Sequence, residues 1–281
     1  MVFLIVMKHS FTSLAIAAFA LTAALPTRAD LPMLKEEPWL GSFIAFKDRG
    51  ARFLLSSKGN SMFEPLKRDG KPIAVTNPVK VKFDIIETLP DGKTVRKKID
   101  DDFYTSDSPA VLDPKEPVTI RGTITGDAKF EITVSEDKGA VCLSGRITDK
   151  GSLKNPLHLA ISIDFLPYKY SSGGDTDEQK KKFKKKARRD EIRLDLDNRE
   201  RSKLDFLDTM NPAKEIKDGF IAAEVRTKGY GGLRWNLTAS ENSKLRFEDK
   251  GERPLYEGFS IYWTINEGAD PAAEKFSIKH N

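Results

Sequence analysis

The segment Leu157-His158-Leu159-Ala160-Ile161-Ser162-Ile163-Asp164-Phe165 alternates large apolar residues with smaller or polar ones. Successive side chains of a β-strand point to opposite faces of a sheet, so this alternation predicts a strand with one buried face. His158, Ser162 and Asp164 then share the other, wetter face of that strand. A helix would instead repeat its apolar residues about every 3.6 positions, which this segment does not do.

The same period of two recurs along the rest of the chain and predicts half-buried antiparallel strands. Its clearest examples are residues 79–85, 118–125, 129–134, 191–196, 233–238 and 259–265. Three turn sequences between such segments predict hairpins: Pro90-Asp91-Gly92, Thr125-Gly126-Asp127 and Asp137-Lys138-Gly139. We therefore predict an all-β protein, a large antiparallel two-sheet β-sandwich of about 12–14 strands.

An export signal is predicted at the beginning of the chain. Residues 11–25 form an uncharged apolar run, with Lys8 before it and Arg28-Ala29 after it. This order is typical of a signal peptide that is cleaved after Ala29. The run has 15 residues, and a membrane-spanning helix needs about 20, so an uncleaved anchor is the weaker alternative. We expect residues 1–29 to be removed and the mature protein, without a transmembrane segment, to be secreted or periplasmic.

The remaining residues, 30–281, are predicted to form a single β-sandwich domain. No linker rich in proline, serine or glycine divides the series of strands, and all-β chains of this size are often single domains. We expect residues 30–38 to be a loosely held arm. The only marked break in the alternation is a charged insert at residues 175–189.

The composition limits the chemistry that the mature chain can carry. Cleavage would remove Lys8 and Arg28 from the 47 basic residues and none of the 42 acidic ones, which leaves a net charge of +3. The single Cys142 excludes an internal disulfide, and only His158 and His280 remain, so zinc sites built on histidine or cysteine are excluded. No motif indicates a cofactor, and we expect none.

The architecture resembles that of the large sandwiches of carbohydrate-active proteins, such as galactose-mutarotase-like domains. This resemblance rests on the long alternating strands and implies the sandwich fold. The paired histidines of the mutarotase pattern are not matched here, because His158 stands alone. The resemblance therefore does not imply the activity of that family.

The charged insert is strongly basic. Acidic residues precede a run with eight positive charges in ten residues, which predicts a short helix over residues 176–187. Its candidate ligand-binding residues are Lys181, Lys185 and Arg188, which could hold an anionic glycan or another anionic envelope polymer. The alternative is a solvated loop without a partner. Nucleic acid is not expected, because no aromatic platform for bases accompanies the charges.

The candidate catalytic residues are His158, Asp164 and Arg146. If residues 141–147 and 157–165 form a hairpin, Arg146 lies beside the wet face of the second strand and could clamp an anion. His158 and Asp164 are separated by six positions along one strand, about 20 Å, so they cannot form a relay with each other. An ordinary wet sheet face is the alternative interpretation.

Other candidates are oxygen ligands and exposed rings. Asp195 and Asp197 could hold calcium at a strand end, but the flanking Arg193 and Arg199 favour ion pairing instead. Tyr230, Tyr256 and Tyr262 are predicted to be accessible and could stack on sugar rings. Trp235 and Trp263 have the parity of the core.

Three functions remain open. We favour an exported, non-catalytic protein that binds a glycan or another envelope polymer. The first alternative is a polysaccharide-active hydrolase or lyase whose carboxylates come from separate strands, such as Asp164 with Asp195 or Glu224. The second is a structural or assembly protein of the cell envelope, which would expose an apolar patch or an unprotected edge strand.

Overall fold

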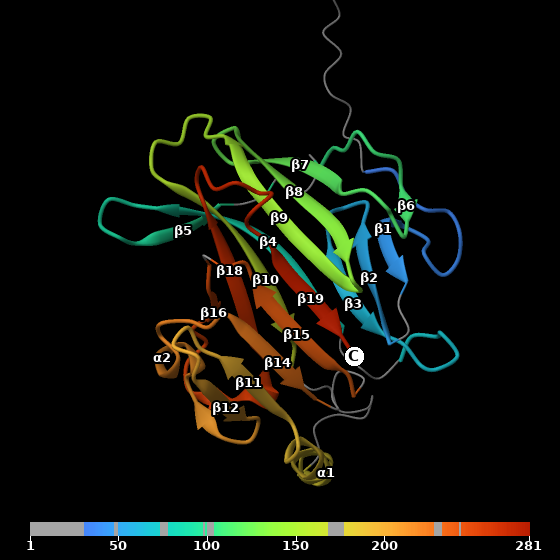
Figure 1. Cartoon of the computed structure of the whole chain (residues 1–281), viewed down its shortest axis with the longest axis vertical. Coiled ribbons are helices and arrows are strands. Elements are labelled where there is room, and N and C mark those ends of the chain that lie inside the picture. Colours follow the sequence, from blue (N-terminus) through green and yellow to red (C-terminus); the bar gives the residue numbers. More distant parts are fainter. Residues whose placement is uncertain are drawn as a thin grey trace, which may run out of the picture.

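The structure of this chain is a computed structural model. It describes residues 31–47, 50–73, 78–97, 99, 104–167, 177–227, 232–241 and 243–281. The predicted signal peptide lies outside these residues. Two large sheets pack face to face, as the alternation predicts (Figure 1). The fold class is thus confirmed: an all-β sandwich with antiparallel pairing almost throughout, with a short helix outside the sheets.

The first sheet has the order β16-β18-β10-β4-β3-β2-β1-β6, with β5 paired beside β4. Only the contact between β1 and β6 is parallel. Its strands are β1 (Ser42–Lys47), β2 (Ala51–Ser56), β3 (Ser61–Pro65), β4 (Val79–Thr88), β5 (Thr94–Lys97), β6 (Val111–Leu112), β10 (Leu157–Phe165), β16 (Leu245–Phe247) and β18 (Phe259–Asn266).

The second sheet has the order β12-β11-β14-β15-β19-β9-β8-β7 and is antiparallel. Its strands are β7 (Val118–Ile124), β8 (Ala128–Asp137), β9 (Ala140–Asp149), β11 (Glu191–Asp195), β12 (Arg201–Asp205), β14 (Ala222–Arg226), β15 (Arg234–Ala239) and β19 (Phe276–His280). The remaining elements are the small pair β13 (Thr209–Met210) and β17 (Arg253–Pro254), the helices α1 (Asp177–Ala187) and α2 (Pro212–Glu215), and the 3-10 turn η1 (Leu255–Glu257).

The described residues contain 19 strands, more than the 12–14 expected. Part of the difference comes from very short strands. β6, β13 and β17 have two residues each, and a pair of residues cannot display a period of two. The three predicted hairpin turns are confirmed, because they join β4 to β5, β7 to β8 and β8 to β9.

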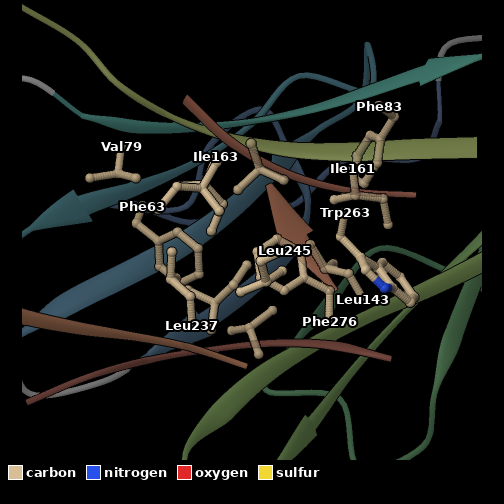
Figure 2. Close-up of a cluster of buried hydrophobic side chains, with 14 of the residues drawn as sticks. Phe63, Val79, Phe83, Leu143, Ile161, Ile163, Leu237, Leu245, Trp263 and Phe276 are labelled. Carbon is tan, nitrogen blue, oxygen red and sulfur yellow. The ribbon is translucent and has the colours of Figure 1, made fainter. Parts of the chain in front are cut away.

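The inward rows of the two sheets form one continuous hydrophobic core (Figure 2). Phe63, Val79 and Ile163 of the first sheet pack in this cluster together with Leu237 and Phe276 of the second. Trp235 and Trp263 are fully buried, which confirms the parity assigned to them. The two outward rows consequently lie on opposite surfaces of the sandwich.

The arm before β1 is not loosely held, contrary to the expectation for residues 30–38. Leu31 is buried, and its main-chain N–H donates to the carbonyl of Ser57 at 3.0 Å. Leu34 donates to the carbonyl of Ser42 at 2.7 Å. These bonds tie the segment to the ends of β1 and β2. The composition of the arm gave no sign of them, because main-chain hydrogen bonds do not depend on side-chain type.

The expected hairpin between residues 141–147 and 157–165 is wrong. β9 pairs with β8 and β19 in the second sheet, whereas β10 pairs with β4 and β18 in the first. The connection at residues 150–156 crosses from one sheet to the other. Because each strand still turns its apolar row inward, the wet rows of β9 and β10 face away from each other.

Candidate functional site

A polar groove lies on the outer face of the first sheet, above β10 and its neighbours. The strand register places three rows of outward side chains across it. They are Ile86–His158–Asn266, Asp84–Ala160–Thr264 and Lys82–Ser162–Tyr262–Arg246. His158, Ser162 and Tyr262, which the sequence assigned to wet strand faces, are thus brought together on one surface.

The groove has a volume of about 370 Å³. Its floor is low in the middle because Ala160 and Ser162 are small. Its walls come from β5 on one side and from β16 and the residues after it on the other, with the side chains of Thr94, Arg96, Arg246, Glu248 and Asp249. The hollow is therefore lined by both hydrogen-bond donors and carboxylate acceptors.

Arg96 joins the two walls of the groove. Its Nε lies 3.4 Å from a carboxylate oxygen of Asp84, and its Nη2 lies 3.5 Å from Glu248. β5 and β16 are separated by four strand-to-strand spacings across the sheet. In a flat sheet, their backbones would therefore lie roughly 19 Å apart. Contact between Arg96 and Glu248 therefore requires the outer face to be concave.

Two acids of the groove have shifted pKa values: hydrogen bonds from Gly251 and Asn211 lower the pKa of Asp249, whereas the pKa of Asp84 is raised. Burial raises its pKa above the ordinary value, and the nearby charges of Arg96 and Lys82 offset this only in part. A partly buried carboxyl group with a raised pKa, in a hollow that also holds a histidine and a tyrosine, is a common feature of functional sites.

His158 lies at one end of the groove with both ring nitrogens occupied. Its Nδ1 is 3.2 Å from the Asn266 side-chain oxygen, and its Nε2 is 3.1 Å from the Thr88 hydroxyl. These two contacts fix the orientation of the ring. A histidine held in this way can donate to or accept from a ligand hydroxyl only by exchanging one of these partners.

Asp164 is buried in the next outward row along β10, between Lys80 and Ser260, and does not line the groove. It accepts a 2.6 Å hydrogen bond from Ser260 and forms an ion pair with Lys82. Lys250 in turn donates to Ser260. The catalytic candidate Asp164 thus serves to join β4, β10 and β18.

Arg146 does not join His158 and Asp164. It lies on the outer face of the second sheet, where its Nε is 2.6 Å from Glu131 on β8. Asp195 and Glu224 also lie on strands of that sheet, with the parity opposite to the buried residues of β11 and β14. The expected pairing of Asp164 with either of them is therefore wrong, since the outer faces are opposed.

The calcium candidates are engaged in ion pairs. Asp195 contacts Arg201 at 3.0 Å, and Asp197 contacts Lys244 at 2.8 Å. Within the described ranges, no group of three or more histidine, cysteine, aspartate or glutamate side chains is arranged to hold a metal ion. The ion-pair interpretation accounts for both residues.

The tyrosine and lysine candidates have different outcomes. Tyr262 lines the groove, whereas Tyr256, in η1, packs against the core. Tyr230 lies outside the described residues. Lys181, Lys185 and Arg188 are exposed on or directly after α1, which confirms the predicted helix.

Sequence reasoning missed Asp84, Arg96 and Glu248. The alternation over residues 79–85 indicates only that Asp84 lies on the polar face of its strand, and β5 shows no alternation because its first three residues are all exposed. The concave shape brings these residues together, and curvature leaves no direct mark on a pattern of apolar and polar residues.

No family model matches this chain, and no curated protein does so either. Among solved structures, the chain is similar to the α-N-acetylgalactosaminidase NagBb from Bifidobacterium bifidum, a quadruple mutant, with 9% identity and a TM-score of 0.47. That match covers 84% of this chain and 35% of NagBb, so the chain spans about a third of that enzyme. It is also similar to the Slr1438 protein from Synechocystis sp. PCC 6803, with 11% identity and a TM-score of 0.46. That match covers 92% of this chain and 98% of Slr1438. Likenesses at this level carry no argument about function.

In the part of the chain that the structure describes, no helix combines the length and the apolar character needed to cross a membrane.

Proposed function

We propose that this protein is exported and binds a glycan, or another hydroxyl-rich envelope polymer, in the groove above β10. The observation that carries the proposal is the combination of one tyrosine ring with donors and acceptors around a shallow hollow. Export rests on the signal peptide predicted for residues 1–29. Binding without catalysis remains the favoured activity.

The chemistry of the groove supports a sugar better than a simple ion. Tyr262 offers an aromatic face and a polar hydroxyl, which suit the apolar and polar sides of a sugar ring. Arg96, Arg246 and Asn266 can donate hydrogen bonds, and Glu248 and Asp249 can accept them. Because both signs of charge are present, the groove is not selective for anions or cations alone.

The proposal is tested by measuring binding of the mature chain, residues 30–281, to a broad array of glycans and polyanions at two salt concentrations. Binding to a defined sugar that persists at high salt supports recognition in the groove, because hydrogen bonds and stacking are screened less than exposed charges. Binding that high salt abolishes would assign the interaction to the charges of α1. Absence of binding would contradict the proposal and favour the envelope-assembly alternative.

A second candidate function is supported by Asp84 and Glu248. One guanidinium group contacts both carboxylates, which places them close to the separation of roughly 5–9.5 Å used by glycosidases. The raised pKa of Asp84 suits a general acid. If the protein hydrolyses the glycan that it binds, Asp84→Asn will abolish turnover and retain binding. Absence of turnover by the unaltered protein on every glycan that it binds would leave binding as the function.

A further inference from the structure

Another hollow lies on the outer face of the first sheet, at the ends of β1, β2 and β3. We call it the arm hollow, because residues 37–39 of the arm before β1 form part of its wall. Residues 66–70, which follow β3, form another part. The volume of the arm hollow is about 980 Å³, and it shares no lining residue with the proposed glycan groove.

Arg52 of β2 is a buried cation that lines the arm hollow. Its side chain points outward, because it alternates with the buried apolar residues of the strand, yet only 7% of the residue is exposed. Its Nε donates to Glu64 at 2.7 Å, its Nη1 donates to the carbonyl of Pro38 at 3.1 Å, and its Cζ lies 5.2 Å from the centre of the Trp39 ring. Among the described residues, these hydrogen bonds engage two of its five N–H groups. The guanidinium is therefore held in place and can still donate to a ligand.

Three exposed cations accompany Arg52 in the lining of the hollow: Lys47, Lys67 and Arg68. Lys47 is the direct partner of Arg52 across the ladder of β1 and β2. Two like charges in this position repel each other, and an anion in the hollow would relieve the repulsion. Lys67 and Arg68 lie in a tight turn, in which the main-chain N–H of Gly70 donates to the carbonyl of Lys67 at 2.9 Å. The turn therefore places two further donors at the hollow.

The acidic groups near the arm hollow do not cancel its positive charge. Among the described lining residues there are four cations and one carboxylate, that of Glu37. Outside the lining, Glu64 offsets Arg52, and the turn also contains Asp69 and Lys71, whose charges offset each other. With every one of these acids counted as charged, two positive charges remain in excess.

The arm hollow is too large for a simple ion and is partly apolar. Pro38 is exposed and Leu66 is half-buried, and both line it. Its volume of about 980 Å³ is near the upper end of ligand pockets, roughly 300–1,000 Å³. A sugar ring with an anionic group fits these features, because the apolar side chains can contact its CH groups and the cations can bind the anion through charge-assisted hydrogen bonds.

The arm hollow and the glycan groove lie on the same face of the first sheet. β2 and β10 are separated by three strand spacings, roughly 14 Å in a flat sheet. The register places Arg52 four residues beyond Ser162 along the strands, roughly 13 Å. Lys80, which is exposed on β4, lies between the two sites. A single oligosaccharide of several units can therefore extend from one site to the other.

We infer, on the basis of the proposed glycan binding, that the arm hollow binds an acidic sugar unit. The anionic group of the sugar lies at Arg52, Lys67 and Arg68, and its ring lies against Pro38 and Leu66. The glycan is thereby specified as one that contains uronic acids or sulfated sugars, since both present an anionic group on a sugar ring.

The test is calorimetric titration of residues 30–281 with digalacturonate and with its methyl ester, which has the same rings without the charges. The acid should bind at least ten-fold more tightly than the ester. Equal affinities would overturn the inference. Inorganic phosphate is the probe for a simple anion, and it should bind at least ten-fold more weakly than digalacturonate. Phosphate binding as tight as that of digalacturonate would show a site for small ions and would also overturn the inference.

Variants of exposed lining residues locate the site. K67Q/R68Q should lower digalacturonate affinity at least five-fold, and Lys47→Gln should lower it at least two-fold, because each removes donors from the hollow. Both variants should fold, since only exposed side chains change. The matched control K129Q/K154Q removes two exposed charges elsewhere and should leave the affinity unchanged. Equal losses in K67Q/R68Q and in this control would show a general effect of net charge and would contradict the assignment.

Two further variants separate the arm hollow from the other candidate sites. A disaccharide in the hollow is too short to reach the groove, so Tyr262→Ala should leave digalacturonate affinity unchanged. Replacing Lys181, Lys185 and Arg188 of the α1 region with glutamine should also leave it unchanged. If Tyr262→Ala abolishes binding and K67Q/R68Q does not, the acidic sugar occupies the groove, which would overturn the inference and support the proposed function.

The kind of anionic group is distinguished by comparing digalacturonate with a sulfated disaccharide. Tighter binding of either one, lost in K67Q/R68Q, supports the inference and identifies its group as the one recognised. If neither acidic disaccharide binds while a neutral glycan of the array does, the inference fails and the proposed glycan binding stands. If no sugar of any kind binds, both fail.

Discussion

The Ser260 hydroxyl on β18 donates a 2.6 Å hydrogen bond to the carboxylate of Asp164 on β10, directly across the ladder. Asp164 is almost fully buried, and its other oxygen is paired with Lys82 on β4. The carboxylate therefore links three adjacent strands in the row next to the groove. Its position explains why a residue with the parity of the wet face is not available to a ligand.

Asp164→Ala is expected to lower the free energy of unfolding by about 2–3 kcal/mol, because a hydrogen-bonded ionic partner is removed from a buried position. Urea denaturation at neutral pH measures this change. The matched variant Ser162→Ala removes a hydroxyl from the same face of the same strand and should cost less than about 1 kcal/mol. Equal effects of the two variants would show that the Asp164 network does not stabilise the sheet.

Gly145 of β9 allows the two sheets to approach each other closely. A Cβ atom there would lie 2.4 Å from the carbonyl oxygen of Glu131 and 2.5 Å from a methyl group of Leu159 on the opposite sheet. We expect Gly145→Ala to destabilise the protein by about 1–3 kcal/mol or more, through overpacking against backbone. A change in the denaturation midpoint within error would show that the sheets can separate at this point without cost.

Gly92→Ala is the control for backbone strain. Gly92 has a φ of +80°, and no atom lies within 4 Å of the position that its Cβ would take. Its replacement should cost only the strain of the left-handed conformation, about 1–2 kcal/mol. The comparison separates packing from conformation, since Gly145 is not in the left-handed region.

The strands and their inward faces could be predicted from the sequence because burial has a period of two. β10 was predicted at residues 157–165, and its bounds are confirmed. The hairpin turns could also be predicted, because the sequence has turn-forming residues there. In the turn between β8 and β9, Lys138 and Gly139 both adopt the positive φ that tight turns require. Local patterns of this kind depend on neighbouring residues alone.

The assignment of strands to sheets could not be predicted in the same way. The alternation indicates which side of β9 and of β10 is apolar. Both strands can bury that side whether they pair in one sheet or lie in two facing sheets. The candidate site depended on that choice. Tyr262 and His158 were correctly given wet faces, whereas Arg146 was placed beside His158 only through the wrong hairpin.

Asp84 should make stability depend on pH in an unusual direction. Its pKa is raised by burial in the folded protein, whereas in the unfolded chain it should stay near the ordinary 3.8. Between the two values the folded state binds more protons, so the free energy of unfolding falls as the pH rises through this window. Relative to Asp84→Asn, the unaltered protein should therefore lose stability from about pH 3.8 upward until the folded pKa is passed.

Asp91→Asn provides a control of opposite sign, measured by the same denaturation series. The hydrogen bonds from Lys93 lower the pKa of Asp91, so its contribution to stability is present above about 3.8 and is lost as the pH falls through the lowered value. A constant difference between the unaltered protein and Asp84→Asn across this range would show that Asp84 is not desolvated.

Tyr262 is expected to contribute the stacking surface of the groove. Tyr262→Ala should weaken binding of a glycan that the array identifies by at least ten-fold, because the ring is lost from the centre of the row Ser162–Tyr262–Arg246. Tyr262→Phe retains the ring and should weaken it less. Isothermal titration calorimetry measures both effects.

Tyr256→Phe is the matched control for Tyr262→Phe, since it removes the same hydroxyl from a tyrosine outside the groove. It should leave glycan affinity unchanged. A loss of affinity with Tyr256→Phe, together with full affinity in Tyr262→Ala, would transfer the site from the outer face of β18 to the segment at η1.

The basic face of α1 should act independently of the groove and of stability. Replacing Lys181, Lys184, Lys185 and Arg188 with glutamine removes charge only from exposed side chains, so the melting temperature should change little. Affinity for heparin, used as an anionic glycan probe, should fall at least ten-fold at low salt, and the residual binding should depend less steeply on salt, because four of the eight positive charges of the insert remain. Deleting residues 177–189 should in contrast lower the melting temperature, because Ala187 is buried in the core cluster. If heparin binding persists in the glutamine variant, the polyanion is bound elsewhere. If the deletion leaves the melting temperature unchanged, the helix contributes nothing to the core.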